Sequence, residues 1–177
     1  EHTHQDQAYT LIDTAGVRRR ARIDNTIEKF SVVKTLQAME MAHVVFLVLD
    51  AQQGVSEQDT HLAGHIVDSG RALVVVINKW DGLASDERDR IKTELSRRLM
   101  FLSFADWRYV SALHGSGVGH LLDAAKMAYR SAMSDLKTAA LTRILQDSIE
   151  QHQPPLARGR RIKSVSYTHL TLPTIVR

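Results

Sequence analysis

The chain has 177 residues, of which 44% are apolar and 24% are charged, a balance typical of a folded globular protein rather than a disordered one. It contains no cysteine, which excludes a disulfide framework and a thiolate metal site and fits a reducing cytoplasm. The net charge of +3 is uneven, because residues 1–130 hold 16 basic and 17 acidic side chains whereas residues 131–177 hold 7 and 3.

Taken in order, the apolar patterns predict strands that alternate with helices. The expected strands are Tyr9–Asp13, Val44–Asp50, Ala72–Asn78 and Trp107–Ser111, and the second is a continuous apolar run expected to be buried on both faces. The expected helices cover residues 27–41, 56–69, 85–98, 118–132 and 138–153, with Ser56 and Ser85 as N-caps and Gly70 as a stop. This alternation predicts an α/β fold with a parallel sheet and right-handed crossovers. Apolar runs of this length are too short to span a bilayer, so no membrane partner is expected.

Polar motifs follow three of the expected strands at their carboxyl ends. Asp13, Thr14, Ala15, Gly16 and Val17 spell D-T-A-G-V, Asn78, Lys79, Trp80 and Asp81 spell N-K-W-D, and Ser111, Ala112 and Leu113 spell S-A-L. In an open parallel sheet the carboxyl ends of the strands form the ligand-binding rim. Three such motifs in this order are typical of the phosphate, guanine and ribose-side motifs of a GTPase.

Asp81 is the residue from which base specificity is predicted. A carboxylate at the last position of N-K-x-D can accept two hydrogen bonds from guanine, from the ring N–H and from the exocyclic amine, whereas adenine presents an acceptor and no amine there. Asn78 is expected to tie the loop to neighbouring backbone and to the base edge, and the stem of Lys79 to cover one face of the base. Trp80 is expected to pack rather than to stack on a ligand. The alternative is a surface turn that matches the motif by chance.

Phosphate and magnesium contacts are predicted from the first motif. Asp13 at a strand end can hold Mg²⁺ through water, and Gly16 allows a backbone N–H to approach a terminal phosphate because it has no Cβ. Val17 stands where many GTPases have a glutamine that orients water, and a valine cannot do this. The alternative for Asp13 and Gly16 is an ordinary strand-to-loop turn. Ser111, Ala112 and Leu113 are expected to offer backbone N–H groups to the base oxygen.

The sequence lacks a G-x-x-x-x-G-K-[ST] loop. This loop provides most phosphate hydrogen bonds, a lysine and the hydroxyl ligand of magnesium in GTPases. The chain also begins with Glu1 rather than methionine, in the middle of a pattern. We therefore expect a fragment that hydrolyses no GTP by itself and binds it weakly.

Several stretches resemble the second GTPase domain of the Der (EngA) family of tandem GTPases. They include Y-T-L-I-D-T-A-G-V-R-R-R from Tyr9, K-F-S-V-V-K-T from Lys29 and Q-P-P-L-A-R-G-R-R-I-K from Gln153, and the likeness covers Tyr9–Lys163. The resemblance implies GTP hydrolysis with Mg²⁺, bound GTP or GDP, and a role in ribosome biogenesis through maturation of the large subunit. It makes residues 13–17 the switch II motif, residues 78–81 the base-specificity motif and residues 111–113 the loop beside the base.

The resemblance also divides the chain. Residues 1–134 correspond to a second GTPase domain without its first strand and P-loop, and residues 135–163 to the start of a KH-like domain that contacts RNA. Residues 164–177 do not fit the family and read as a foreign or read-through tail. The expected partners are a guanine nucleotide and ribosomal RNA or the large ribosomal subunit, and the expected form is a cytoplasmic monomer. Two alternatives remain open, namely a fragment that binds RNA without nucleotide and an inert truncated product.

Overall fold

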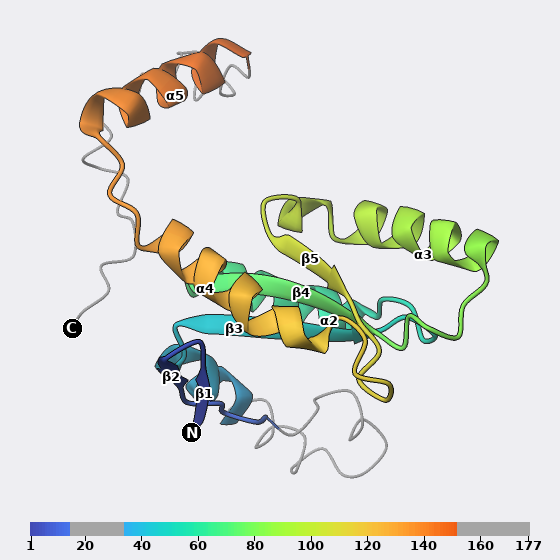
Figure 1. The fold of residues 1–177 in the computed structure, drawn as a ribbon. Helices are drawn as coiled ribbons and strands as arrows, with labels where there is room; N and C mark the ends of the chain where they lie inside the picture. Colours follow the sequence, from blue (N-terminus) through green and yellow to red (C-terminus); the bar gives the residue numbers. More distant parts are fainter. Residues whose placement is uncertain (15–33, 152–177) are drawn as a thin grey trace. The chain divides into compact units, whose positions relative to one another are not determined.

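The computed structural model describes residues 1–14 and 34–151 and divides the chain into two compact units, residues 1–132 and residues 133–177 (Figure 1). The first unit opens with a hairpin of two antiparallel strands, β1 (His2–His4) and β2 (Gln7–Tyr9). Its two-residue turn, Gln5 and Asp6, has positive φ at both positions, as this type of tight hairpin turn requires.

A parallel sheet of three strands forms the centre of the first unit. The strands are β3 (Val44–Asp50), β4 (Ala72–Asn78) and β5 (Asp106–Tyr109), in the order β3-β4-β5. Six consecutive residues of β4, residues 72–77, are buried, because this strand has a neighbour on each side and a helical layer on each face. An unbroken apolar run is the sequence signature of such a strand.

Helices cover both faces of this sheet. They are α2 (Glu57–Asp68), α3 (Ser85–Arg98) and α4 (Leu121–Ala132), accompanied by the short 3₁₀ helices η2 (Met100–Leu102) and η3 (Val118–His120) and a helical segment over residues 34–41. Ser56 caps α2: its hydroxyl accepts from the Asp59 amide, and the Asp59 carboxylate accepts from the Ser56 amide. This reciprocal capping box confirms the predicted start of the helix.

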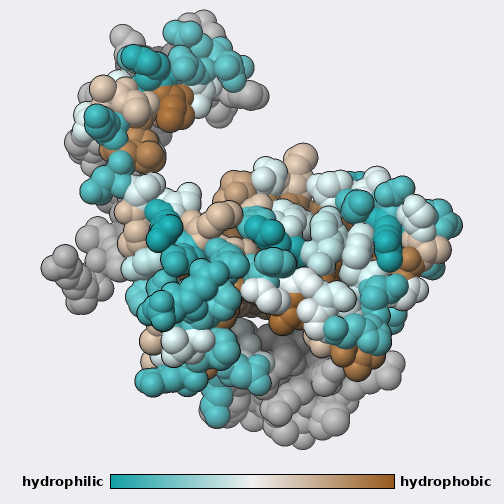
Figure 2. Space-filling view, viewed as in Figure 1, coloured by the Kyte–Doolittle hydropathy of each residue, from teal (hydrophilic) through white to brown (hydrophobic). Residues whose placement is uncertain are grey.

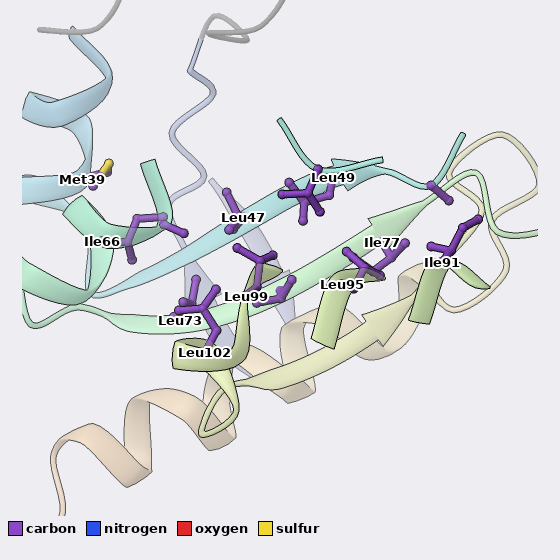
Figure 3. Close-up of a cluster of buried hydrophobic side chains, with 14 residues drawn as sticks. Met39, Leu47, Leu49, Ile66, Leu73, Ile77, Ile91, Leu95, Leu99 and Leu102 are labelled. Carbon is purple, nitrogen blue, oxygen red and sulfur yellow. The ribbon is translucent and has the colours of Figure 1, made fainter. Parts of the chain in front are cut away.

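The larger hydrophobic core lies on one face of the sheet, under α2, α3, η2 and the segment 34–41 (Figure 3). Leu73, Val75 and Ile77 of β4 belong to this core. Leu99 and Leu102 also belong to it, and these residues are 1% and 0% exposed. A smaller core on the other face joins Val74 and Val76 to α4 through Ala124. The alternation of β4 side chains between the two cores is the period-2 pattern of a strand.

Most predicted elements are present with small shifts of boundary. The strands 44–50 and 72–78 and the helix 85–98 have the predicted limits, and the helix predicted from residue 56 begins at Glu57 behind its cap. The last strand begins at Asp106, one residue earlier than predicted, and ends at Tyr109, two residues earlier than predicted. The helix predicted from residue 118 begins as η3 and becomes α-helical at Leu121.

Three predictions about these elements are wrong. Only Tyr9 of the predicted strand Tyr9–Asp13 is in a strand, because the described strands offer residues 10–14 no neighbour to pair with. β3 is not buried on both faces, because Val48 is 59% exposed, and among the described strands β3 lies at the edge of the parallel sheet. Ala84, not Ser85, is the N-cap of α3, and its amide is satisfied by the Glu87 carboxylate.

The second unit contains α5 (Thr138–Gln151). None of the residues of α5 is buried, and Figure 2 shows hydrophobic surface on this helix. Ile144 of α5 is 59% exposed. The predicted end of this helix at Pro154 lies outside the described residues. In the described parts of the chain no helix combines the length and the apolar character needed to cross a membrane.

Candidate functional site

The carboxyl ends of the three parallel strands bring together polar groups from distant parts of the chain. Asp50 at the end of β3 is in register with Asn78 at the end of β4, and Ile77 is in register with Tyr109 at the end of β5. The loops after β4 and β5 therefore leave the sheet side by side. This places N-K-W-D and S-A-L at one edge, as the sequence predicts.

Asn78 joins the two loops. Its side-chain oxygen accepts hydrogen bonds from the Lys79 amide at 2.8 Å and from the Ala112 amide at 2.9 Å. Two further backbone bonds, from Trp80 to the Val110 carbonyl and from Val110 to the Ile77 carbonyl, hold the same strand ends together. The prediction that Asn78 ties its loop to neighbouring backbone is confirmed.

Lys79 has a left-handed backbone, with φ of +64°, and forms an ion pair with Asp50. The ammonium lies 2.6 Å from the Asp50 carboxylate, and half of the lysine side chain is exposed. This pair links the end of β3 to the loop after β4. The prediction that the Lys79 stem covers a base stays a prediction.

Asp81 presents its carboxylate at this edge with its side chain 37% exposed. The Ser111 hydroxyl is the main cause that holds the pKa of Asp81 below its ordinary value, followed by a backbone hydrogen bond and the nearby charges of His114 and Arg88, while partial desolvation acts in the opposite direction. The ionised form is therefore favoured in the folded state, and an ionised carboxylate is a pure hydrogen-bond acceptor. This is the state that a base with two adjacent N–H donors requires.

Replacing Ser111 with alanine is expected to raise the pKa of Asp81 toward its ordinary value, because the largest stabilising contact of the carboxylate is removed. Carboxyl-carbon chemical shifts followed through acidic pH measure the change. Because the folded-state pKa is lowered, the ionised carboxylate stabilises the fold at pH values above its ordinary pKa, and this contribution is lost as the pH falls through the lowered folded-state value. Ser116→Ala, whose hydroxyl makes no described contact with Asp81, is the control; equal pKa values in the two variants would refute the role of Ser111.

The backbone amides of the S-A-L loop are mostly occupied. The Ser111 amide donates to the Ser116 carbonyl at 2.9 Å, and the Ala112 amide donates to Asn78. All three amides were expected to donate to a base oxygen. Of the three, Leu113 is the one whose amide has no described acceptor. Leu113 itself is 87% exposed.

Trp80 packs against protein rather than facing the site. Its ring lies 4.4 Å from the Tyr109 ring, and Arg88 and Lys92 of α3 lie over it at 5.9 Å. Trp80 and Tyr109 also contact the larger core. This agrees with the prediction that Trp80 is a packing residue.

The residues predicted to contact phosphate and metal are described only in part. Asp13 is exposed and Thr14 half-exposed in the irregular segment after β2, and Ala15, Gly16 and Val17 lie outside the described residues. Within residues 1–14 and 34–151, no three His, Cys, Asp or Glu side chains come together as metal ligands would. A single carboxylate that acts through water does not need such a cluster, but it does not make a metal site by itself.

Sequence reasoning missed two residues of this site, His114 and Gly117. The His114 ring nitrogen Nε2 lies 3.1 Å from Asp81 Oδ2. Gly117 has φ of +75°, and a Cβ at this position would lie 2.9 Å from the Tyr109 carbonyl oxygen. The G-S-G spacing of residues 115–117 is the only sequence signal for this tight loop, and the position of His114 directly after S-A-L is the only signal for its contact.

Comparison with known proteins gives a consistent result. The family model for the elongation factor Tu GTP binding domain matches residues 1–131. Proteins called GTPase Der are similar over most of the chain: the one from Saccharophagus degradans is 57% identical over 96% of this chain and 36% of its own length, and the one from Halorhodospira halophila is 60% identical over 92% and 34%. The chain thus spans about a third of the length of these relatives.

A solved structure is also similar. It is the crystal structure of translation elongation factor SelB from Methanococcus maripaludis in complex with the GTP analogue GppNHp. The TM-score is 0.49 and the sequence identity 21%, over 62% of this chain and 24% of the SelB chain.

Proposed function

The chain belongs to the family of elongation factor Tu-type GTP binding domains, and from this premise we propose that it binds a guanine nucleotide by its base at the edge formed by the loops after β4 and β5. Its similarity to GTPase Der, predicted from the motifs, is confirmed by identities of 57% and 60%. The observation that supports the base site most strongly is the Asn78 side chain, which joins the N-K-W-D loop to the S-A-L loop by its bond to Ala112.

The donor and acceptor pattern of the site fits guanine. Asp81 offers two acceptor oxygens to the ring N–H and the exocyclic amine of guanine, and Leu113 offers an amide that can reach the base oxygen. Adenine would place an acceptor opposite the carboxylate and leave it without a partner. A carboxylate that loses both of its hydrogen-bond donors in this way binds adenine less tightly than guanine. The site is thus specific for guanine over adenine.

Magnesium and the phosphates belong to a second part of the proposal. We assign Asp13 as a ligand of Mg²⁺ through water and residues 14–17 as backbone contacts of a terminal phosphate. Because the sequence contains no G-x-x-x-x-G-K-[ST] loop, the described residues do not build a magnesium site by themselves, and the proposed binding of the base does not depend on the ion. When bound, magnesium would neutralise phosphate charge.

The wider role concerns a protein longer than this chain. The whole protein would hydrolyse GTP in the cytoplasm, as a monomer, and act in ribosome biogenesis through contacts with ribosomal RNA or the large ribosomal subunit. Residues 1–134 would be the truncated second GTPase domain, residues 135–163 the start of a KH-like domain and residues 164–177 a non-native tail. The similarity to GTPase Der over about a third of that protein's length supports the first two assignments, and the assignment of residues 164–177 rests on their sequence alone.

The 177-residue chain is expected to hydrolyse no GTP above a buffer blank. Phosphoryl transfer needs the lysine, the amides and the magnesium ligand of the phosphate loop, and the sequence does not contain that loop. Phosphate release at saturating GTP and Mg²⁺ measures this directly. Hydrolysis above the blank that disappears in the Asp81→Asn variant would contradict the prediction, whereas hydrolysis unchanged in that variant would indicate a contaminating enzyme.

Binding of RNA without nucleotide is the second candidate function. The excess of basic over acidic side chains in residues 131–177, 7 against 3, favours an anionic partner for this part of the chain. Binding to a ribosomal RNA segment should then fall steeply between low and high salt, because phosphate contacts release counterions. If no salt-dependent binding to RNA were observed, the result would favour the alternative that the second unit is part of an inert truncated product.

A further inference from the structure

His114 occupies one of the two oxygens with which Asp81 would read a base. Its Nε2 lies 3.1 Å from Asp81 Oδ2, and the two side chains are 60% and 37% exposed. The histidine belongs to the loop after β5, which also supplies Ser111 and Leu113. The contact therefore joins the same two loops that form the base site.

A guanine base and His114 both need this oxygen as an acceptor. The ring N–H and the exocyclic amine of guanine lie side by side and need both carboxylate oxygens, and a donor that already binds one oxygen weakens the second hydrogen bond which that oxygen accepts. We infer that His114 is an internal competitor for the guanine-reading carboxylate and that it sets the affinity of the site. This inference rests on the proposed function of Asp81.

The surroundings leave His114 free to move aside. Its side chain is 60% exposed, it is flanked by Leu113, which is 87% exposed, and by Gly115, whose φ is +73°. By contrast, Ser111 is 2% exposed and fixed by its backbone bond to Ser116. Displacement of His114 thus needs no change in the sheet or in the strand ends.

The charge of the imidazole decides the strength of the competition. The Ser111 hydroxyl and His114 face the Asp81 carboxylate from the loop after β5, and Arg88 faces it from α3. Lys79, two residues before Asp81, forms an ion pair with Asp50. Among these residue types only histidine ordinarily changes its charge between about pH 5 and 8. A protonated His114 holds the carboxylate as an ion pair, and a neutral one holds it only by a hydrogen bond. Guanine binding should therefore strengthen as the pH rises through this range.

Guanosine is the appropriate probe, because it has no phosphate group that titrates in the same range. Its affinity for the full chain is measured by amide chemical shifts at pH 5.5 and pH 8. The wild-type chain should bind guanosine roughly 2- to 5-fold more tightly at pH 8, the range expected for a partly exposed ion pair. His114→Ala should bind it roughly 2- to 5-fold more tightly than wild type at pH 5.5 and show no change with pH. His114→Gln, a neutral donor, should also lose the pH dependence.

His120→Ala is the matched control, since this exposed histidine of η3 makes no described contact with Asp81. It should behave as wild type at both pH values. Equal affinities of wild type and His114→Ala at pH 5.5 would overturn the role of His114 while leaving the base site intact. Binding of guanosine that is absent in every variant, or unchanged by Asp81→Asn, would overturn the base site and the competition with it.

Discussion

Replacing Asp81 with asparagine is expected to weaken guanosine binding by roughly 10- to 100-fold, because the variant keeps only one of the two acceptors for the two guanine donors. The substitution keeps the size of the side chain but turns one acceptor oxygen into an NH₂ donor, which then faces the amine of guanine. The same change should create affinity for xanthosine, because xanthine has a carbonyl oxygen where guanine has its amine. Affinities of the two nucleosides for both chains, measured by amide chemical shifts, test the exchange.

Asp86→Asn provides the control for charge. Asp86 lies in the first turn of α3, is exposed and makes no described side-chain contact, so this variant removes the same charge a short distance from the site. It should bind guanosine as wild type does and show no gain for xanthosine. If Asp81→Asn retained its guanosine affinity, Asp81 would not be the residue that reads the base.

Replacing Gly117 with alanine is expected to destabilise the first unit by about 2–5 kcal/mol. A side chain at φ of +75° costs about 1–2 kcal/mol in backbone strain. A Cβ would also lie 2.9 Å from the Tyr109 carbonyl oxygen and 3.3 Å from Val110 Cγ1, and forcing such a contact apart costs about 1–3 kcal/mol more. The loop that holds Ser111 against Ser116 would shift, so guanosine binding should weaken as well. Urea unfolding followed by circular dichroism measures the stability.

Two neighbouring glycines separate the effect of backbone strain from the effect of the close contact with Tyr109. Gly115 has φ of +73° but open space around its Cβ position, so Gly115→Ala should show the strain alone, about 1–2 kcal/mol. Gly119 has neither a positive φ nor a close neighbour, and Gly119→Ala should change the stability little. Equal losses for Gly117→Ala and Gly115→Ala would show that the close approach to Tyr109 is absent in solution.

Much of the sheet could be predicted because its central strand has a strong local signal. The six-residue apolar run of β4 is long enough to require burial on both faces, and Ser56 and Asp59 form a capping box that fixes where α2 begins. β3 has a similar apolar run, yet Val48 is exposed. The sequence of a strand does not show whether a neighbour is present on each side, so the edge position of β3 could not be predicted.

The two strands of the N-terminal hairpin could not be located from the sequence for a different reason. Its strands have three residues each, and its turn places Gln5 and Asp6 at positive φ without the glycine that normally marks such a turn. The apolar residues Leu11 and Ile12 favoured a strand over residues 9–13, but both are exposed at 63% and 45%. Pattern alone identifies a segment that could pair, whereas pairing depends on a partner strand distant in the sequence.

The base site was predicted in its residues and only partly in its contacts. Motif order identified Asn78, Asp81 and Ser111, and strand register then brings them to one edge. Two contacts of the site depend on the path of two loops. They are the hydrogen bond from the Ala112 amide to the Asn78 side chain and the contact of His114 with Asp81. Loop paths follow from tertiary packing around Gly117, which no periodic pattern in the sequence records.

Chemical-shift mapping with two nucleosides tests directly whether the loops after β4 and β5 bind guanine and not adenine. Amide spectra of the labelled chain are recorded with increasing guanosine and, separately, with adenosine at the same concentrations. If the loops after β4 and β5 bind guanine, guanosine shifts the amides of residues 78–81 and 111–114 and adenosine leaves them unchanged. Equal shifts with both nucleosides, or guanosine shifts confined to other parts of the chain, would contradict it.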